Sequence, residues 1–208
     1  MSNFTIISFF TPDFTHFAED LKADCERFGY PHYIVEVNKA GSLIDTWDRK
    51  VEFIHDAINQ LGTVLWLDVE CRLPAPIPPE WTPPLISTFS MGNSNPVSSG
   101  VLLLDPSYLP LVKVWARHAR INTELPDDYV FDFLLSQYDL PFNFVKTDFF
   151  NRDTESQIVR GQWSTPSTII QHPTINRWPN PLNYSLAFNG KALRADENEA
   201  AKRARKRK

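Results

Sequence analysis

The 208-residue sequence has only two cysteines, Cys25 and Cys71, and no apolar run long enough to span a membrane. Two cysteines provide neither a disulfide framework nor the ligand spacing of a zinc site. Cys25 falls on the apolar face of an expected helix, where a thiol behaves as a small core residue. The apolar segment 4–10 lacks a basic n-region and a small-residue cleavage site. We therefore expect a cytoplasmic protein without a signal peptide or a membrane span.

Charge is unevenly distributed along the chain. Residues 191–208 hold eight Lys or Arg residues and three acids, a net charge of +5, whereas the rest of the chain carries −9. Length and composition predict one domain over residues 1–190, followed by a basic tail that is flexible or a frayed helix. Residues 202–208 contain six cations and no aromatic residue, so binding to a nucleic-acid backbone is one interpretation and a solubilising terminus is the other.

The first seventy residues alternate short apolar strands with helical periodicity. Strands are predicted at 4–10, 32–37 and 64–67, with helices over 14–28 and through 51–61 that end at Gly29 and Gly62. This β-α-β-α-β order predicts a parallel sheet with right-handed crossovers.

The second half of the body is less regular. Six prolines within residues 74–84 exclude a helix or a central strand, so we expect a surface loop there. The pattern then predicts an edge strand at 85–89, a turn-rich loop at 91–100, a strand at 101–104, helices around 108–119 and from 127, a short strand at 142–145 and an apolar run at 169–170. Together these elements predict an α/β fold with a mixed, mainly parallel sheet.

Two carboxylates follow the third strand, in the sequence Asp68-Val69-Glu70. Because side chains alternate along a strand, we expect Asp68 and Glu70 on one face at its carboxyl end. Ligands bind at this end of open α/β sheets, and paired carboxylates suit a divalent cation that carries phosphate oxygens. The alternative is an acidic pair that caps the next turn or pairs with Arg72.

The order of motifs resembles small GT-A glycosyltransferase-like proteins, the nucleotide-diphospho-sugar transferase group, including phage and bacterial members. The segments that carry the resemblance run from the first strand to a late apolar run: 6–11, 47–54, 64–70, 98–105, 126–130 and 169–172. The chain departs from the family pattern at two positions. Glu70 replaces the second acid of the Asp-x-Asp motif, and Asp127-Asp128 stands where the family has Asp-Gln.

The resemblance implies a donor site and a metal site. Metal ligands would be Asp68, Glu70 and His172, a set compatible with Mn²⁺ or Mg²⁺. The residues implied at the nucleotide-sugar donor are Thr11, Lys50, Asp68, Ser99, Gly100 and Arg177. The implied catalytic residues are Asp127 and Asp128, either of which would bind a sugar or acceptor hydroxyl or act as a base. Simpler interpretations remain: Lys50 as a solvated helix residue, the two aspartates as helix-capping acids, His172 as a loop residue, and Trp47 and Trp178 as packing residues.

The resemblance implies a metal-assisted glycosyltransferase that moves a sugar from a nucleoside-diphosphate donor to a hydroxyl acceptor. The basic tail at 202–208 suggests an acceptor on DNA, such as a hydroxymethylated pyrimidine of phage DNA, in which case the protein acts in the host cytoplasm. The alternative function is a catalytically silent module of the same fold, tethered to nucleic acid by its tail. Glu70 favours the silent module, and the convergence of the three expected ligands favours the enzyme.

Overall fold

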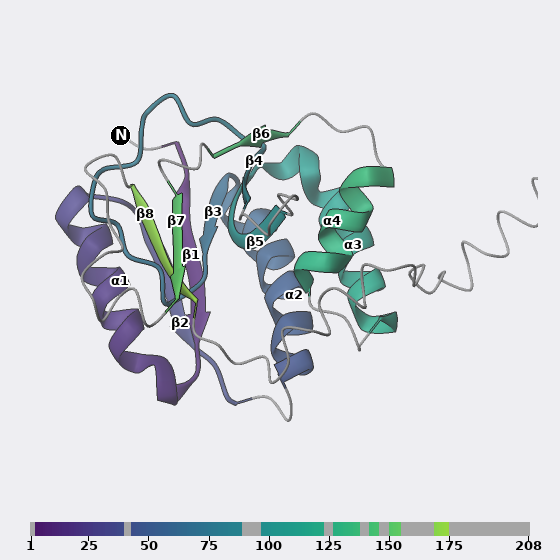
Figure 1. Ribbon diagram of the computed structural model, residues 1–208, viewed down its shortest axis with the longest axis horizontal. Helices are drawn as coiled ribbons and strands as arrows, with labels where there is room; N and C mark the ends of the chain where they lie inside the picture. Colours follow the sequence, from purple (N-terminus) through teal and green to yellow (C-terminus); the bar gives the residue numbers. More distant parts are fainter. Residues whose placement is uncertain are drawn as a thin grey trace, which may run out of the picture.

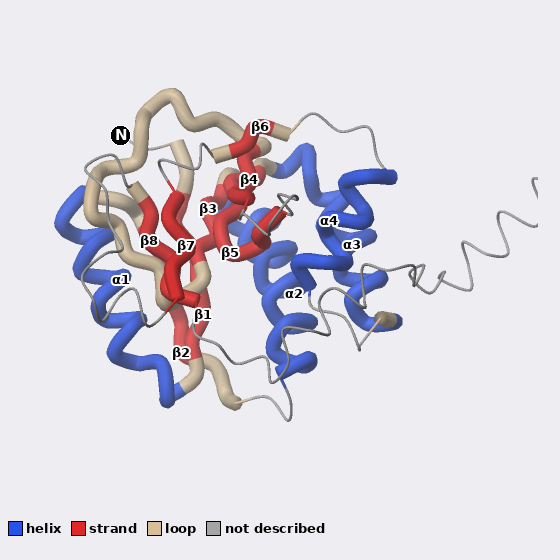
Figure 2. Tube along the Cα trace, viewed as in Figure 1, coloured by secondary structure: helices blue, strands red, loops and turns tan. Residues whose placement is uncertain are grey.

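The computed structural model describes residues 3–39, 43–88, 97–122, 127–137, 142–145, 150–154 and 169–174 (Figures 1 and 2). The basic tail predicted at 191–208 lies outside these residues. Its predicted binding to DNA therefore stays a prediction. None of the helices in the described part is both long and apolar enough to cross a membrane.

The first half of the chain builds the predicted parallel unit. Its elements are β1 (Thr5–Phe10), η1 (Pro12–Phe14), α1 (Thr15–Phe28), β2 (His32–Glu36), α2 (Leu43–Leu61) and β3 (Val64–Leu67). Strand β1 pairs in parallel with both β2 and β3. Gly29 and Gly62 follow the two helices with φ values of 70° and 81°, a conformation that glycine adopts without steric cost. The β-α-β-α-β prediction is confirmed.

The second half completes the sheet and adds a second, smaller one. Its elements are β4 (Leu85–Thr88), β5 (Val97–Leu104), η2 (Pro106–Tyr108), α3 (Leu109–Ile121), α4 (Asp127–Gln137), β6 (Asn143–Phe144), β7 (Phe150–Thr154) and β8 (Ile170–Thr174). The six-stranded sheet has the order β2-β1-β3-β5-β4-β6, in which β5 is antiparallel to both of its neighbours. Strands β7 and β8 form a separate parallel pair.

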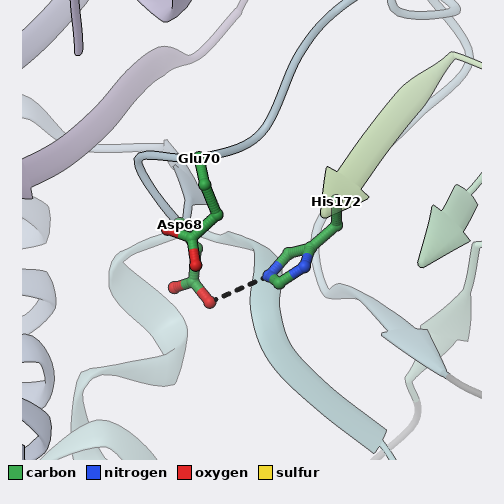
Figure 3. A group of neighbouring side chains, drawn as sticks. All are labelled: Asp68, Glu70 and His172. Atoms are coloured by element: carbon green, nitrogen blue, oxygen red, sulfur yellow. Dashed lines mark hydrogen bonds and ion pairs between the residues drawn. The ribbon is translucent and has the colours of Figure 1, made fainter. Parts of the chain in front are cut away.

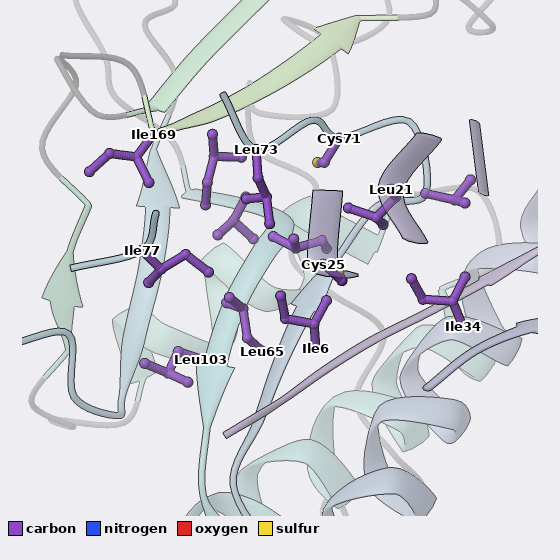
Figure 4. Packing of buried hydrophobic residues seen from close by; sticks show 14 of the residues in the cluster. Ile6, Leu21, Cys25, Ile34, Leu65, Cys71, Leu73, Ile77, Leu103 and Ile169 are labelled. Carbon is purple, nitrogen blue, oxygen red and sulfur yellow. The ribbon is translucent and has the colours of Figure 1, made fainter. Parts of the chain in front are cut away.

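Helices cover both faces of the large sheet, with α1 on one side and α2, α3 and α4 on the other (Figure 1). Alternate strand residues face the two layers. Ile6 and Leu65 pack with α1 residues such as Leu21 (Figure 4), whereas Ile7 and Trp66 belong to the cluster under α2–α4. Burial on both faces explains why these strands are continuously apolar in the sequence. Cys25 is buried in the α1-side core, as predicted, and burial raises the pKa of its thiol to about 12.

Several predicted boundaries are wrong. Strand β5 begins at Val97, so residues 97–100 belong to a strand instead of the expected loop. Strand β4 is not at the edge, because β6 pairs with it at Leu85 and Ile86. Strand β3 ends at Leu67, so Glu70 lies in a turn and not on the strand face. His172 lies within β8, as the resemblance implied, so its alternative as a loop residue is wrong, and β7 was not predicted.

Candidate functional site

Asp68, Glu70 and His172 come together at the carboxyl end of β3 (Figure 3). Asp68 directly follows the strand, and the backbone N–H of Cys71 donates to the carbonyl of Asp68 at 2.9 Å, which closes a tight turn through Glu70. His172 reaches the same point from β8. One ligand-capable atom from each of the three residues lies within 4.8 Å of the others. A turn, and not strand alternation, therefore brings the two carboxylates together.

The Asp68 carboxylate has a separate partner set on each oxygen. The indole N–H of Trp66 at 2.9 Å and the ammonium of Lys50 at 3.1 Å approach Oδ1, while His172 Nε2 lies 3.0 Å from Oδ2. Burial raises the pKa of Asp68, but the charge of Lys50 and the hydrogen bonds from His172 and Trp66 outweigh it and hold the pKa well below its usual range. Asp68 is thus fixed as a carboxylate, with Oδ2 directed toward His172.

Gly100 on β5 leaves the space in which this pair meets. Its carbonyl accepts a hydrogen bond from the Asp68 backbone at 2.9 Å. A β-carbon at this position would lie 2.7 Å from His172 Nε2 and 2.9 Å from Asp68 Oδ2. Position 100 therefore excludes any side chain, because an added carbon would occupy the place where the candidate ligands converge.

The donor set fits the divalent cation that the sequence predicts. Carboxylate oxygens with one imidazole nitrogen suit Mn²⁺, and Mg²⁺ accepts the oxygens. The space beside Gly100, which Asp68 Oδ2 and His172 Nε2 border, is a second observation that supports a bound ion. The metal-binding role itself stays a prediction.

Lys50 is buried beneath the site and does not lie on a solvated helix face. Its ammonium lies 2.7 Å from Ser99 Oγ, 3.1 Å from Asp68 Oδ1 and 3.1 Å from Asp127 Oδ2. Burial lowers the pKa of Lys50, but the negative charges of Asp127, Asp68 and Asp128 outweigh this and raise it. An ammonium has three N–H donors, and all three have protein acceptors here. The predicted contact of Lys50 with phosphate stays untested.

The two aspartates at the start of α4 differ in their surroundings. Asp127 is buried and accepts a hydrogen bond from Ser99 Oγ at 2.6 Å, whereas Asp128 is half-buried and accepts one from the Ser99 backbone at 2.7 Å. Burial raises the pKa of Asp127 to about 6, with a further increase from Asp128 and an opposing effect from Lys50. Both side chains therefore tie the start of α4 to β5, which is more than a helix cap requires.

No protein-family profile and no curated protein sequence matches the chain. Among solved structures, it is similar to a glycosyltransferase involved in the glycosylation of the major capsid of PBCV-1. The TM-score is 0.58 at 19% sequence identity, over 81% of this chain and 91% of that one. The chain has a glycosyltransferase-like α/β fold. The GT-A-like fold class expected from the sequence is confirmed.

The remaining predicted site residues fall into two groups in this glycosyltransferase-like fold. Thr11 follows β1, and Asp68 follows β3. Because β1 and β3 are parallel neighbours, both residues lie at the carboxyl ends of the strands. The Thr11 hydroxyl donates to the carboxylate of Asp13. Arg177, Trp178 and the tail at 202–208 lie outside the described residues, and the structure does not describe the side chain of Trp47.

One contributor to the site, Trp66, was missed in the sequence, and Arg72 was given the wrong partner in its alternative interpretation. Trp66 lies on β3 two residues before Asp68, and this spacing was the available signal for its contact with the carboxylate. Arg72 does not serve the acidic pair as the alternative interpretation required. Its guanidinium instead contacts Asp24 and Asp20 on α1, at 2.7 Å and 3.0 Å. No local pattern in the sequence indicates this contact, because 48 residues separate Arg72 from Asp24.

Proposed function

We propose that the protein is a metal-dependent glycosyltransferase that moves a sugar from a nucleoside-diphosphate sugar to a hydroxyl acceptor. The observation that carries this proposal is the convergence of Asp68, Glu70 and His172 at the carboxyl end of β3, beside a position where only glycine fits. Ligands of open α/β sheets bind at this edge. The similarity in fold to a glycosyltransferase supports the same reaction class.

In this proposal Asp68, Glu70 and His172 would hold Mn²⁺ or Mg²⁺, which would supply Lewis-acid stabilisation of negative charge on the leaving diphosphate. The protein groups hold the site in shape. Trp66 and Lys50 fix one oxygen of Asp68, so the other oxygen keeps its direction toward His172. A prepared site of this kind needs little reorganisation when charge develops.

Asp127 and Asp128 have separate roles in the proposed reaction. Asp127 is enclosed by Lys50, Ser99 and the start of α4, so its role is to hold the cluster together. Asp128 is the more accessible carboxylate of the pair. We assign to Asp128 the binding of a sugar or acceptor hydroxyl, and the acceptance of the hydroxyl proton if the reaction requires a base.

The acceptor is the least constrained part of the proposal. A hydroxymethylated pyrimidine in phage DNA remains our candidate, and it depends on the basic residues 202–208. The solved structure of similar fold is described as taking part in the glycosylation of a viral capsid. A protein acceptor is therefore the second substrate to include in an assay.

A donor panel tests the function directly. UDP- and GDP-sugars are added with and without Mn²⁺, and thermal stability and release of nucleoside diphosphate are measured. A ligand at a hundredfold excess over its dissociation constant stabilises the native state by roughly 2.7 kcal/mol. We expect one donor to raise the unfolding temperature only when Mn²⁺ is present, and we expect this increase to be lost in Asp68→Asn. The control Glu19→Gln, which changes an exposed acid on α1, should keep the increase. Binding without turnover of any acceptor would instead favour the silent module.

A further inference from the structure

His172 is supplied by a sheet that is separate from the main one. Strand β8 pairs with β7, and neither strand is part of the six-stranded sheet. A backbone bridge links β8 to the chain just after Glu70: Arg72 N donates to Gln171 O at 2.8 Å, and Gln171 N donates to Arg72 O at 2.9 Å. Gln171 precedes His172, and Arg72 lies two residues beyond Glu70. One bridge therefore lies next to two of the three candidate metal ligands.

The Arg72 side chain is anchored on α1. Its Nε and Nη2 donate to the two oxygens of Asp24 at 2.7 Å and 3.1 Å, and its Nη1 lies 3.0 Å from Asp20. Asp24 is only 2% exposed and also accepts a hydrogen bond from the backbone of Leu73 at 2.9 Å. The paired bonds of a guanidinium with a carboxylate fix direction as well as distance. Helix α1 thereby holds residues 72 and 73 by both side chain and backbone.

The third ligand, Asp68, has an independent support. It follows β3 in the main sheet, and its Oδ1 is held by Trp66 and Lys50. The two supports share no side chain. The position of Glu70 and His172 relative to Asp68 therefore depends on how residues 71–73 are held against α1, in addition to the Cys71–Asp68 turn and the Asp68–His172 contact.

We infer that the Asp24–Arg72 pair is a positioning device for the metal site, which holds Glu70 and His172 in register with Asp68 through the Arg72–Gln171 bridge. The inference rests on the metal site of the proposed function. Neither Asp24 nor Arg72 belongs to the candidate ligand set. Partners that orient metal ligands commonly change metal affinity by roughly 10- to 100-fold when they are replaced.

The test replaces both members of the pair, as Asp24→Asn/Arg72→Met. This double variant keeps the net charge and avoids leaving one buried ion without its partner. We expect at least about tenfold weaker binding of Mn²⁺ alone, measured by calorimetric titration. The matched control, Glu52→Gln/Arg120→Met, removes an exposed ion pair between α2 and α3 and should leave the affinity unchanged. Arg72→Lys keeps the charge but loses the paired geometry, so its affinity should fall between wild type and the double variant.

A double-mutant cycle with His172→Ala separates positioning from general loss of stability. If the pair acts through His172, its replacement should weaken Mn²⁺ binding less in the His172→Ala background than in wild type. Affinity within twofold of wild type in the double variant, or an equal effect in both backgrounds, would overturn the inference.

The outcomes for the two proposals can be told apart. Mn²⁺ binding without glycosyl transfer contradicts the proposed reaction and leaves the positioning role to be judged by the cycle. If wild type does not bind Mn²⁺, the proposed metal site fails, and the same cycle is measured in free energies of unfolding. Non-additive effects of the pair and His172→Ala then support the mechanical link, and additive effects refute it.

Discussion

Gly100→Ala tests the geometry of the site without removing any candidate ligand. The added β-carbon would lie 2.7 Å from His172 Nε2, 2.9 Å from His172 Cδ2 and 2.9 Å from Asp68 Oδ2. Unstrained contacts of carbon lie at roughly 3.5–4.0 Å, so these groups must move apart by about 0.6–1 Å or more. His172 is 3% exposed and has little room to move. We therefore expect Mn²⁺ affinity to fall by about 10- to 100-fold, as when a metal ligand loses its orientation.

The assay for Gly100→Ala combines Mn²⁺ titration with urea unfolding. The additional methyl group should also cost about 1–3 kcal/mol of stability, the usual range for overpacking a filled interior. Ser8→Ala is the matched control, because Ser8 is buried on β1, which β3 separates from β5, and its hydroxyl has no hydrogen-bond partner within the described part of the chain. This control should keep both affinity and stability. Mn²⁺ binding by Gly100→Ala within twofold of wild type would refute the assignment of the metal site.

Three further predictions concern buried ionisable groups. Lys50→Met leaves the carboxylates of Asp68 and Asp127 without their shared cation and should lower the free energy of unfolding in urea by about 3–5 kcal/mol. Adding Asp127→Asn should recover part of this loss. An unchanged urea midpoint in Lys50→Met would contradict the described network. Burial raises the pKa of Cys25 to about 12, so its thiol should resist iodoacetamide at pH 8 in the native protein and react after the protein is unfolded. Rapid labelling of the native protein would argue against a buried Cys25. Burial raises the pKa of Asp127 from 3.8 to about 6, so its contribution to stability is fully present below pH 3.8 and is lost as the pH rises through about 6. The stability of metal-free wild type relative to Asp127→Asn should therefore fall over that interval, and a difference independent of pH would refute the shift.

The helices and strands that could be predicted are those that neighbouring residues in the sequence specify by their hydrophobic pattern and by their terminating glycines. The buried strands β1 and β3 are short apolar runs, and the helices α1 and α2 end at glycines with positive φ. The contact between Asp68 and His172 spans 104 residues. Only the resemblance to a known family indicated that these two residues meet, since neither composition nor periodicity relates positions so far apart.

The missed features depend on tertiary contacts. Strand β7 has the sequence Phe-Asn-Arg-Asp-Thr, which shows no apolar alternation, and it forms because β8 provides a partner. Lys50 was expected at the donor phosphate or, in the simpler interpretation, on a solvated helix face, because a lone lysine gives no sign that two carboxylates will surround it. The Asp24–Arg72 contact joins α1 to the turn after β3 for the same reason. Local patterns report burial of apolar faces, and they do not report which charges pair across the fold.

The charge of the whole cluster bears on the choice between an enzyme and a silent module. Lys50 is the cation at its centre, and it contacts Asp68 and Asp127 directly. Two carboxylates thus share one ammonium. Asp128 is linked to this group through Ser99, and Glu70 lies with Asp68 and His172 among the candidate metal ligands. Burying excess negative charge is costly unless a cation compensates for it. A divalent cation held by Asp68, Glu70 and His172 would supply that compensation at the edge where sheet proteins of this kind bind ligands. The proposed glycosyl transfer would use this cation, and for this reason we favour the enzyme over the silent module.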